Sequence, residues 1–210
     1  MSDDHVKNTI AVYDAMAGKY AEKLNYYAPL PERERFISLL PHHAHILDVG
    51  CGPGRDADYF TANGSSVTGV DFSEKLLEIA RLRVPQAIFH KQDFRSLHFS
   101  KQSFDGIWAC ASLLHLKRDE VPAVLGSFFQ LLKPGGVLFI MVKEGSGEAD
   151  VTEELSSHLS RHFTYFQKKE LKNILKDAGF EVEEVYTYNE KDRRLDHRDL
   201  WWISSFFRKP

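Results

Sequence analysis

A short apolar run, a glycine-rich turn and a helix-like pattern follow one another in residues 45–60, HILDVGCGPGRDADYF. The run HILDV is mostly aliphatic and bounded by glycine, which predicts a buried strand. The residues after the glycines predict a helix that ends at Asn63 and Gly64. Glycines between a strand and a helix let a ligand approach the backbone, so this stretch predicts a ligand site on an α/β fold.

The alternation of strands and helices continues along the 210 residues. Further strands are predicted at residues 66–71, 87–90, 104–111, 137–142, 181–188 and 200–209, with helices between most of them. This order predicts a mostly parallel sheet with helices on both faces. The length and a hydrophobic content of 43% suit one domain with a substantial core, and the first forty residues look helical.

Two classes of ligand fit a glycine-rich turn of this kind. Gly52, Gly54 and Ala57 satisfy the dinucleotide pattern GxGxx(G/A), a weak signal that would indicate an NAD-type oxidoreductase. Asp48 argues against a pyrophosphate there, because a carboxylate repels its charge and favours the ammonium and sulfonium groups of S-adenosylmethionine. Asp71 closes the second predicted strand, where a carboxylate accepts hydrogen bonds from ribose hydroxyls.

Five motifs occur in the order and spacing of a known family: ILDVGCGPGRDADYF, VTGVDFS, KQDFRSLHF, FDGIWACASLLHL and LLKPGGVLFIMV. The chain thereby resembles the small-molecule branch of the class I S-adenosylmethionine-dependent methyltransferases, with a domain of type 11 or 25, most closely over residues 46–142. The resemblance implies a Rossmann-like, three-layer α/β fold around a seven-stranded sheet, mostly parallel with an antiparallel last strand. We expect one domain over residues 1–210, with a helical cap at 1–40 and a substrate-side insertion at 144–166.

The resemblance also implies where S-adenosylmethionine binds, with S-adenosylhomocysteine as the product. Asp71 would hold the ribose hydroxyls, and Asp93 would accept a hydrogen bond from the adenine amino group. Tyr13 and Tyr20 share one face of the first predicted helix and are expected to close over the cofactor. The full set expected around the cofactor is Tyr13, Tyr20, Asp48, Gly50, Cys51, Gly52, Asp71, Phe72, Gln92, Asp93, Phe94, Ala109, Cys110 and Leu113.

Three residues are candidates for the acceptor side of the site. His115 follows the fourth predicted strand and is the candidate base or acceptor contact. Arg161 and Tyr165 lie in the aromatic segment RHFTYF and are candidate acceptor-facing residues. A catalytically silent S-adenosylmethionine-binding protein is the alternative, because no complete catalytic constellation accompanies these residues.

Bulk properties narrow the expected partners and compartment. The formal net charge is −3 and no dense lysine or arginine run occurs, so no nucleic acid is expected as a partner. The longest apolar stretch, VLFIMV, is far too short to span a bilayer, and two cysteines without a CxxC pattern suit reduced thiols. No complete metal-ligand set is evident. We therefore expect a cytoplasmic methyltransferase that acts on a small-molecule acceptor without a metal.

Overall fold

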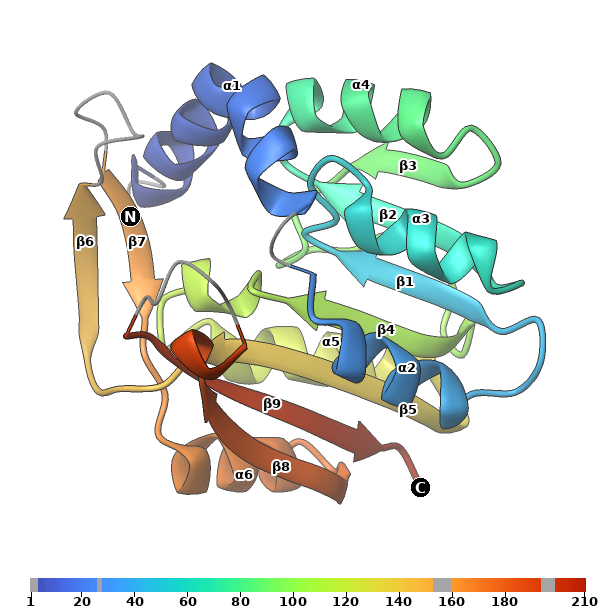
Figure 1. The fold of residues 1–210 in the computed structure, drawn as a ribbon. Helices are drawn as coiled ribbons and strands as arrows, with labels where there is room; N and C mark the ends of the chain where they lie inside the picture. Colours follow the sequence, from blue (N-terminus) through green and yellow to red (C-terminus); the bar gives the residue numbers. More distant parts are fainter. Residues whose placement is uncertain (1–3, 26–27, 153–159, 194–198) are drawn as a thin grey trace.

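A seven-stranded sheet lies between two layers of helices in the computed structural model, which describes residues 4–25, 28–152, 160–193 and 199–210 (Figure 1). The strands of this sheet are β1 (His45–Val49), β2 (Ser66–Asp71), β3 (Ile88–Lys91), β4 (Phe104–Cys110), β5 (Leu132–Lys143), β8 (Glu181–Asn189) and β9 (Trp201–Arg208). The helices are α1 (Asp4–Asn25), α2 (Leu30–Ser38), α3 (Arg55–Ala62), α4 (Glu74–Arg83), α5 (Val121–Leu131) and α6 (Lys168–Asp177). Two short 3₁₀ turns are η1 (Leu113–His115) and η3 (Glu190–Asp192).

The strand order is β3-β2-β1-β4-β5-β9-β8. Strands β1 to β5 pair in parallel, whereas β9 runs antiparallel to both β5 and β8. The expected seven-stranded sheet with an antiparallel last strand is therefore confirmed. Strand order reverses between β1 and β4, and ligands of open α/β sheets bind beyond the carboxyl ends of the strands at such a point.

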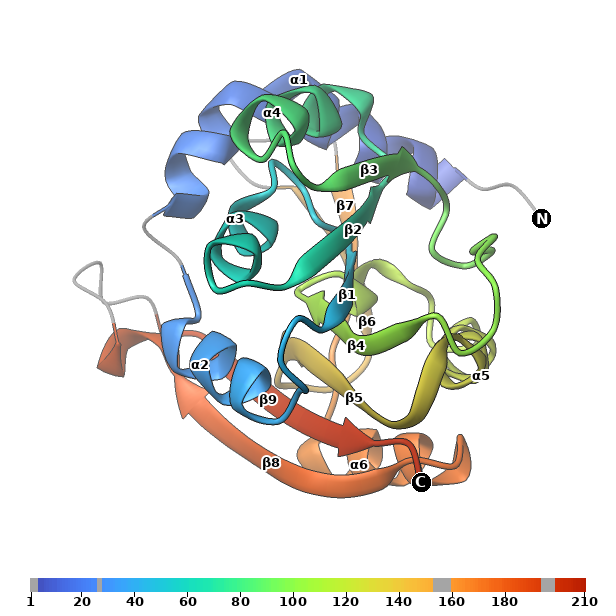
Figure 2. The same ribbon diagram turned by 90° about the vertical axis from the view of Figure 1, so that its right-hand side faces the viewer.

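Alternate residues of the strands face different helical layers. In β5, Leu138 and Ile140 belong to the core shared with α5 and α6, whereas Val137 and Phe139 belong to the core shared with α2, α3 and α4. Figure 2 shows α2 and α3 on one side of the twisted sheet and α5 on the other. Burial on both faces explains why inner strands such as β1 and β5 contain continuous apolar runs.

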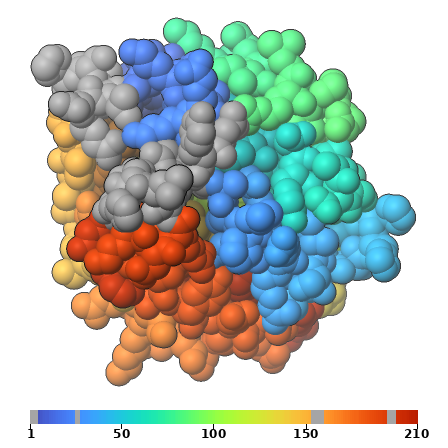
Figure 3. All heavy atoms as spheres, viewed as in Figure 1, coloured from blue at the N-terminus to red at the C-terminus, as the bar shows by residue number. Residues whose placement is uncertain are grey.

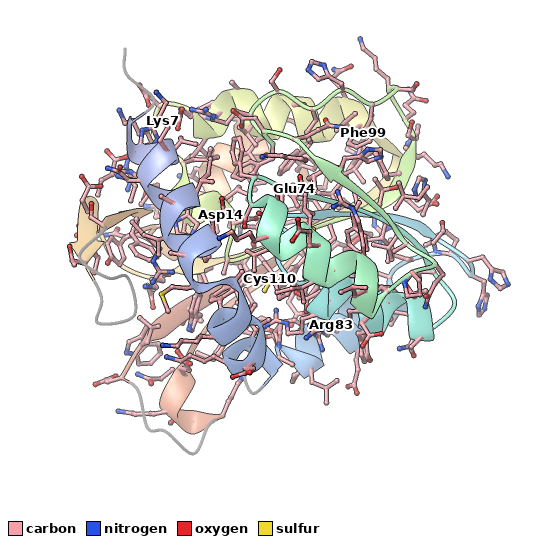
Figure 4. All side chains as sticks on the ribbon, turned by 90° about the horizontal axis from the view of Figure 1, so that it is seen from above. Lys7, Asp14, Glu74, Arg83, Phe99 and Cys110 are labelled. Atoms are coloured by element: carbon pink, nitrogen blue, oxygen red, sulfur yellow. The ribbon has the colours of Figure 1, made fainter. Side chains whose placement is uncertain are left out.

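Helix α1 covers the carboxyl ends of the parallel strands. It contacts α4 and α3 on one side and β7 on the other, and the space-filling view shows it in blue between these parts (Figure 3). Figure 4 looks down on α1 and labels Asp14 beside α4, where the Ser73 hydroxyl donates to its carboxylate at 2.5 Å. Helix α2 packs on α3 instead, so within residues 1–40 it is α1 that forms the cap.

The segment 144–166, which was expected to be a substrate-side insertion, contains a separate antiparallel pair of strands. These are β6 (Glu148–Thr152) and β7 (Ser160–Thr164). The residues of β6 are mostly exposed and carry charges, so they lack the apolar alternation by which a strand is recognised in sequence. Strand β7 packs on α1 and η1 and thereby joins the wall around the ligand end of the sheet.

Candidate functional site

The turn after β1 is shaped by three glycines in the left-handed region. Gly50, Gly52 and Gly54 have φ values of 70°, 53° and 76°, which side chains with a Cβ adopt only at a cost. A Cβ at Gly50 would lie 2.5 Å from the Cβ of Ser112, so glycine there lets the loops after β1 and β4 touch. The backbone of this turn consequently lines the space beneath α1.

Asp71, the last residue of β2, ties the glycine turn to the start of α4. Its carboxylate accepts hydrogen bonds from the backbone N–H of Gly52 at 2.9 Å and of Ser73 at 2.8 Å. Burial raises the pKa of Asp71, and the N–H donors oppose that rise because they favour the charged form. This carboxylate therefore stands at the carboxyl edge of the sheet, where a ribose diol would be recognised.

Asp48 tests whether the site fits the ammonium group of the expected cofactor. The residue is 2% exposed, and its Oδ2 has no hydrogen-bond partner among the described residues. Burial and the nearby Asp56 carboxylate raise the pKa of Asp48 well above its usual range. A buried, incompletely satisfied carboxylate beneath the glycine turn suits a cation bound close by, so the chain fits S-adenosylmethionine better than a pyrophosphate.

A buried ion network anchors the start of α3 against the sheet. The Asp56 carboxylate accepts hydrogen bonds from Arg33 at 2.8 Å, from Arg55 at 2.7 Å and from the indole N–H of Trp108 at 2.9 Å. Burial favours protonation of Asp56, but the two guanidinium groups outweigh it and hold its pKa well below the usual range. Because α2, α3 and β4 each supply a partner, the glycine turn is held rigidly.

A cavity of two adjoining lobes lies between α1 and the sheet. The large lobe, about 200 Å³, is enclosed by α1, the glycine turn, the ends of β4 and β5, β7 and the start of β9. The small lobe, about 90 Å³, is enclosed by α1, the end of β2, the start of α4 and residues 94–95. Tyr13, Tyr20 and His115 line both lobes. The small lobe is walled mainly by apolar side chains, among them Ile10, Phe72 and Phe94.

The structure brings most of the predicted site residues to this cavity. Those that line it are Tyr13, Tyr20, Gly50, Cys51, Gly52, Asp71, Phe72, Phe94, Cys110, His115 and Arg161. The two thiols are free, and burial raises the pKa of both Cys51 and Cys110, so neither is activated as a nucleophile.

Six predicted residues lie outside the lining, among them Asp48 beneath the turn. The Asp93 carboxylate binds the guanidinium of Arg95 at 2.7 Å, and Arg95 itself lines the small lobe. The side-chain carbonyl of Gln92 accepts the backbone N–H of His98 at 3.1 Å.

The other three outside the lining are Ala109, Leu113 and Tyr165. Ala109 and Leu113 are wholly buried in the core. The Tyr165 ring covers Gly145, so it supports the β6–β7 hairpin rather than facing the cavity.

His115 takes part in a chain of hydrogen bonds across the large lobe. Its Nδ1 lies 2.8 Å from the carbonyl oxygen of His162, and its Nε2 lies 2.9 Å from the hydroxyl of Tyr13. A carbonyl only accepts, so Nδ1 carries the proton and Nε2 accepts from Tyr13. Arg161 in turn donates to the Tyr13 oxygen at 3.1 Å. Burial, together with the charges of Arg161 and Lys143, lowers the pKa of His115 to about 3.

Sequence reasoning missed several lining residues. Arg55 at the start of α3, Lys143 at the end of β5 and Phe163 on β7 all border the large lobe. Lys143 was open to prediction, since residues at the carboxyl ends of parallel strands meet at the ligand edge. Phe163 belongs to the segment RHFTYF, which was predicted to face the acceptor, although Phe163 was not named there individually.

Among the residues whose placement is described, no three histidine, cysteine or carboxylate side chains gather in a way that could hold a metal ion. No helix in the described ranges is both long and apolar enough to cross a bilayer.

Known proteins resemble this chain in both sequence and structure. A family model described as "Methyltransferase domain" matches residues 15–185. The chain is 28% identical over 198 residues to the putative methyltransferase YqeM of Bacillus subtilis, a match that covers 89% of this chain and 80% of the relative. It is 26% identical over 204 residues to the ubiquinone biosynthesis O-methyltransferase of Thiobacillus denitrificans, covering 86% of each protein.

A solved structure shares the fold. The 1,6-didemethyltoxoflavin-N1-methyltransferase of Burkholderia thailandensis, crystallised with 1,6-didemethyltoxoflavin and S-adenosylhomocysteine, superimposes with a TM-score of 0.75. The match covers 100% of this chain and 91% of that protein at 22% sequence identity.

Proposed function

From its membership of the class I S-adenosylmethionine-dependent methyltransferases, to which this chain belongs, we propose that it transfers a methyl group to a small-molecule acceptor bound in the large lobe. S-adenosylmethionine is the cofactor of this family. The match of residues 15–185 to a methyltransferase family model argues against the alternative of an NAD-type oxidoreductase. Relatives whose names specify ubiquinone biosynthesis and toxoflavin precursors support an acceptor of small-molecule size.

The observation that carries the proposal is the position of Asp71 between the glycine turn and the small lobe. In this arrangement Asp71 holds the ribose hydroxyls, and the apolar walls of the small lobe, including Phe72 and Phe94, hold the adenine. Gly50 and Gly52 line both lobes, which suits the methionine part at their junction.

When bound, S-adenosylmethionine supplies an electrophilic methyl group on a sulfonium, and transfer leaves S-adenosylhomocysteine. The chain's own contribution is then to orient the acceptor and exclude water. Tyr13 and Tyr20, whose rings meet edge to face at 5.0 Å, close the cavity from α1. This cover lies directly over the glycine turn, because a Cβ on Gly52 would contact the Tyr20 ring at 4.0 Å.

We assign the removal of the acceptor's proton to the Tyr13 and His115 pair. As the acceptor atom loses its proton to the Tyr13 oxygen, the Tyr13 hydroxyl proton passes to Nε2 of His115, already 2.9 Å away. Arg161, 3.1 Å from the same oxygen, stabilises the negative charge that develops there. The lowered pKa of His115 keeps Nε2 unprotonated at neutral pH, so Nε2 accepts the hydrogen bond from Tyr13 rather than donating one.

Binding of S-adenosylhomocysteine to Asp71→Asn tests the cofactor assignment. Losing a charged hydrogen-bond acceptor costs about 1.5–3 kcal/mol, so affinity should fall about 10- to 150-fold in calorimetric titration. Asp105→Asn is the matched control, since Asp105 also accepts a backbone N–H, from His45, but lies at the amino end of β4. Equal affinity of Asp71→Asn and wild type would refute the ribose assignment.

Formation of S-adenosylhomocysteine from a panel of phenols, amines and acids tests the reaction itself. With an accepted substrate, Tyr13→Phe should lower kcat about 100-fold or more, because the ring remains and the hydroxyl is lost. The affinity for S-adenosylhomocysteine should stay near that of wild type, and Tyr165→Phe, outside the cavity, should keep full activity. Tight binding without turnover of any acceptor would instead favour the catalytically silent binding protein.

A further inference from the structure

Two buried hydroxyls of the small lobe, which we call the hydroxyl pair, have no hydrogen-bond partner among the described residues. They belong to Thr9 of α1 and to Ser112 in the loop between β4 and η1. Thr9 is 8% exposed and Ser112 is 4% exposed, and both line the lobe. Buried polar groups are ordinarily hydrogen-bonded, so the pair indicates a polar ligand that enters this lobe.

Other polar side chains of the same lobe are already paired. The Ser73 hydroxyl donates to the Asp14 carboxylate at 2.5 Å, and the Tyr13 hydroxyl lies 2.9 Å from Nε2 of His115. These contacts hold α1 against α4 and against η1 without any ligand. The lobe therefore contains polar side chains that serve the fold and, in the hydroxyl pair, two that the described fold does not use.

The residue expected to bind the adenine amino group is engaged elsewhere. Both carboxylate oxygens of Asp93 accept from Arg95, Oδ2 from the guanidinium at 2.7 Å and Oδ1 from the backbone N–H at 2.8 Å. The same guanidinium binds the Glu120 carboxylate at 2.8 Å. Asp93 also lies outside the lining of the small lobe, so the polar edge of an adenine bound there needs other partners.

Adenine carries ring nitrogens that accept hydrogen bonds and an amino group that donates them. The apolar walls of the lobe, among them Ile10, Leu76 and Leu116, suit the body of the base but offer its polar atoms no partner. A hydroxyl both donates and accepts, so it suits either kind of adenine atom. Thr9 reaches the lobe from the covering helix and Ser112 from the end of the sheet, so two separate elements present the hydroxyl pair to one bound base.

We propose that Thr9 and Ser112, rather than Asp93, hydrogen-bond the adenine of S-adenosylmethionine and make the site selective for that base. This inference rests on the proposed function, because it assigns residues to the cofactor of the same site. Thr9 belongs to α1, so the bound base also links the covering helix to the sheet. Loss of either hydroxyl then weakens cofactor binding without weakening the ligand-free fold.

Calorimetric titration of Thr9→Val and Ser112→Ala with S-adenosylhomocysteine is the first test. Each substitution removes one hydroxyl with little change in side-chain size, so the dissociation constant should rise about three- to tenfold. The melting temperature of the ligand-free protein should not fall, because the lost hydroxyl has no partner in the described part of the fold. A purely structural role for the hydroxyl would lower the melting temperature instead.

Analogues of S-adenosylhomocysteine that differ at one base atom test whether the hydroxyls contact the base. The set is S-inosylhomocysteine, in which an oxygen replaces the amino group, and the 1-deaza, 3-deaza and 7-deaza compounds, in which CH replaces one ring nitrogen. At least one analogue should bind wild type about three- to tenfold more weakly than S-adenosylhomocysteine. This difference should disappear in Thr9→Val or Ser112→Ala, whereas Asp93→Asn should retain it.

Matched controls remove hydroxyls that lie outside both lobes. Thr61→Val on α3 and Ser38→Ala on α2 each remove a hydroxyl that donates to a backbone carbonyl at 2.7 Å. Both variants should bind every compound as wild type does. A similar loss of affinity in these controls would overturn the assignment to the hydroxyl pair.

The two proposals fail in different ways. If S-adenosylhomocysteine does not bind wild type, the proposed function fails. If it binds, but Thr9→Val and Ser112→Ala bind it as tightly as wild type or discriminate fully against every analogue, the hydroxyl pair does not bind the base, and the proposed function stands. An effect in only one of these variants refutes the assignment of the other residue, and loss of discrimination in Asp93→Asn alone would assign the adenine edge to Asp93.

Discussion

Replacing His115 with asparagine should reduce the loss of stability that the protein suffers in mild acid. The unfolded chain binds a proton at this histidine below its ordinary pKa of 6.5, whereas the folded protein does so only below about 3. Between these values the unfolded state holds more protons, so the free energy of unfolding falls as the pH falls. Stability from this group is therefore complete above pH 6.5 and is lost progressively down to about pH 3.

The magnitude follows from the two pKa values. Between pH 7 and pH 5 the contribution of His115 to the free energy of unfolding falls by about 2 kcal/mol. The groups that face it are Tyr13 from α1, Lys143 from β5, and Arg161 and His162 from β7. Arg161 and Lys143 remain charged over this range, so they lower the pKa of His115 at both pH values.

Urea unfolding at pH 7 and pH 5 measures the effect. Wild type should lose about 2 kcal/mol more than His115→Asn between the two conditions, even if the variant is less stable at both. Burial also lowers the pKa of His5 and His45, but these residues are present in both proteins and their effects cancel in the comparison. His43→Asn, which removes an exposed histidine, should lose as much as wild type. Equal losses for wild type and His115→Asn would refute the reasoning.

Further substitutions test the glycine turn and the N-cap of α4. Gly135→Ala, where φ is +77° and the space is open, should lower the free energy of unfolding by about 1 kcal/mol in denaturant unfolding. Gly50→Ala should lower it by about 1–3 kcal/mol more, because the new Cβ would meet Ser112. Adding Ser112→Gly to Gly50→Ala should recover part of that difference, and no recovery would argue against the clash. Ser73→Ala removes the N-cap side chain of α4, which accepts the backbone N–H of Leu76 at 3.2 Å. The free energy of unfolding should fall by about 1 kcal/mol, which lowers the melting temperature by about 2–4 °C. An unchanged melting temperature would count against the N-cap.

Much of the fold was accessible from the sequence because its signals are local. The strand into the glycine turn and the order of strands and helices each depend on neighbouring residues. Family motifs then supplied the antiparallel last strand. The pair of strands within residues 144–166 was missed, since the residues of β6 are mostly exposed and show no apolar alternation.

Some positions in the candidate site were also predictable from local sequence signals, and others were not. Asp71 was predicted at the cavity and lies there, because a residue at the carboxyl end of an inner parallel strand has little choice of position. Asp93 follows an edge strand, and its carboxylate turns to Arg95 instead. The motif KQDFRSLHF contains both residues, but the contact between their side chains was not predicted from it.

By itself, the sequence determined the family and the methyl donor, and it predicted the edge of the sheet at which that donor binds. These depend on glycines and carboxylates at fixed places beside one strand. Only the tertiary structure brought Thr9 and Ser112 to one lobe and set the tautomer of His115 against Tyr13. Such residues lie on separate elements, and no local pattern relates them before folding places them around the same space.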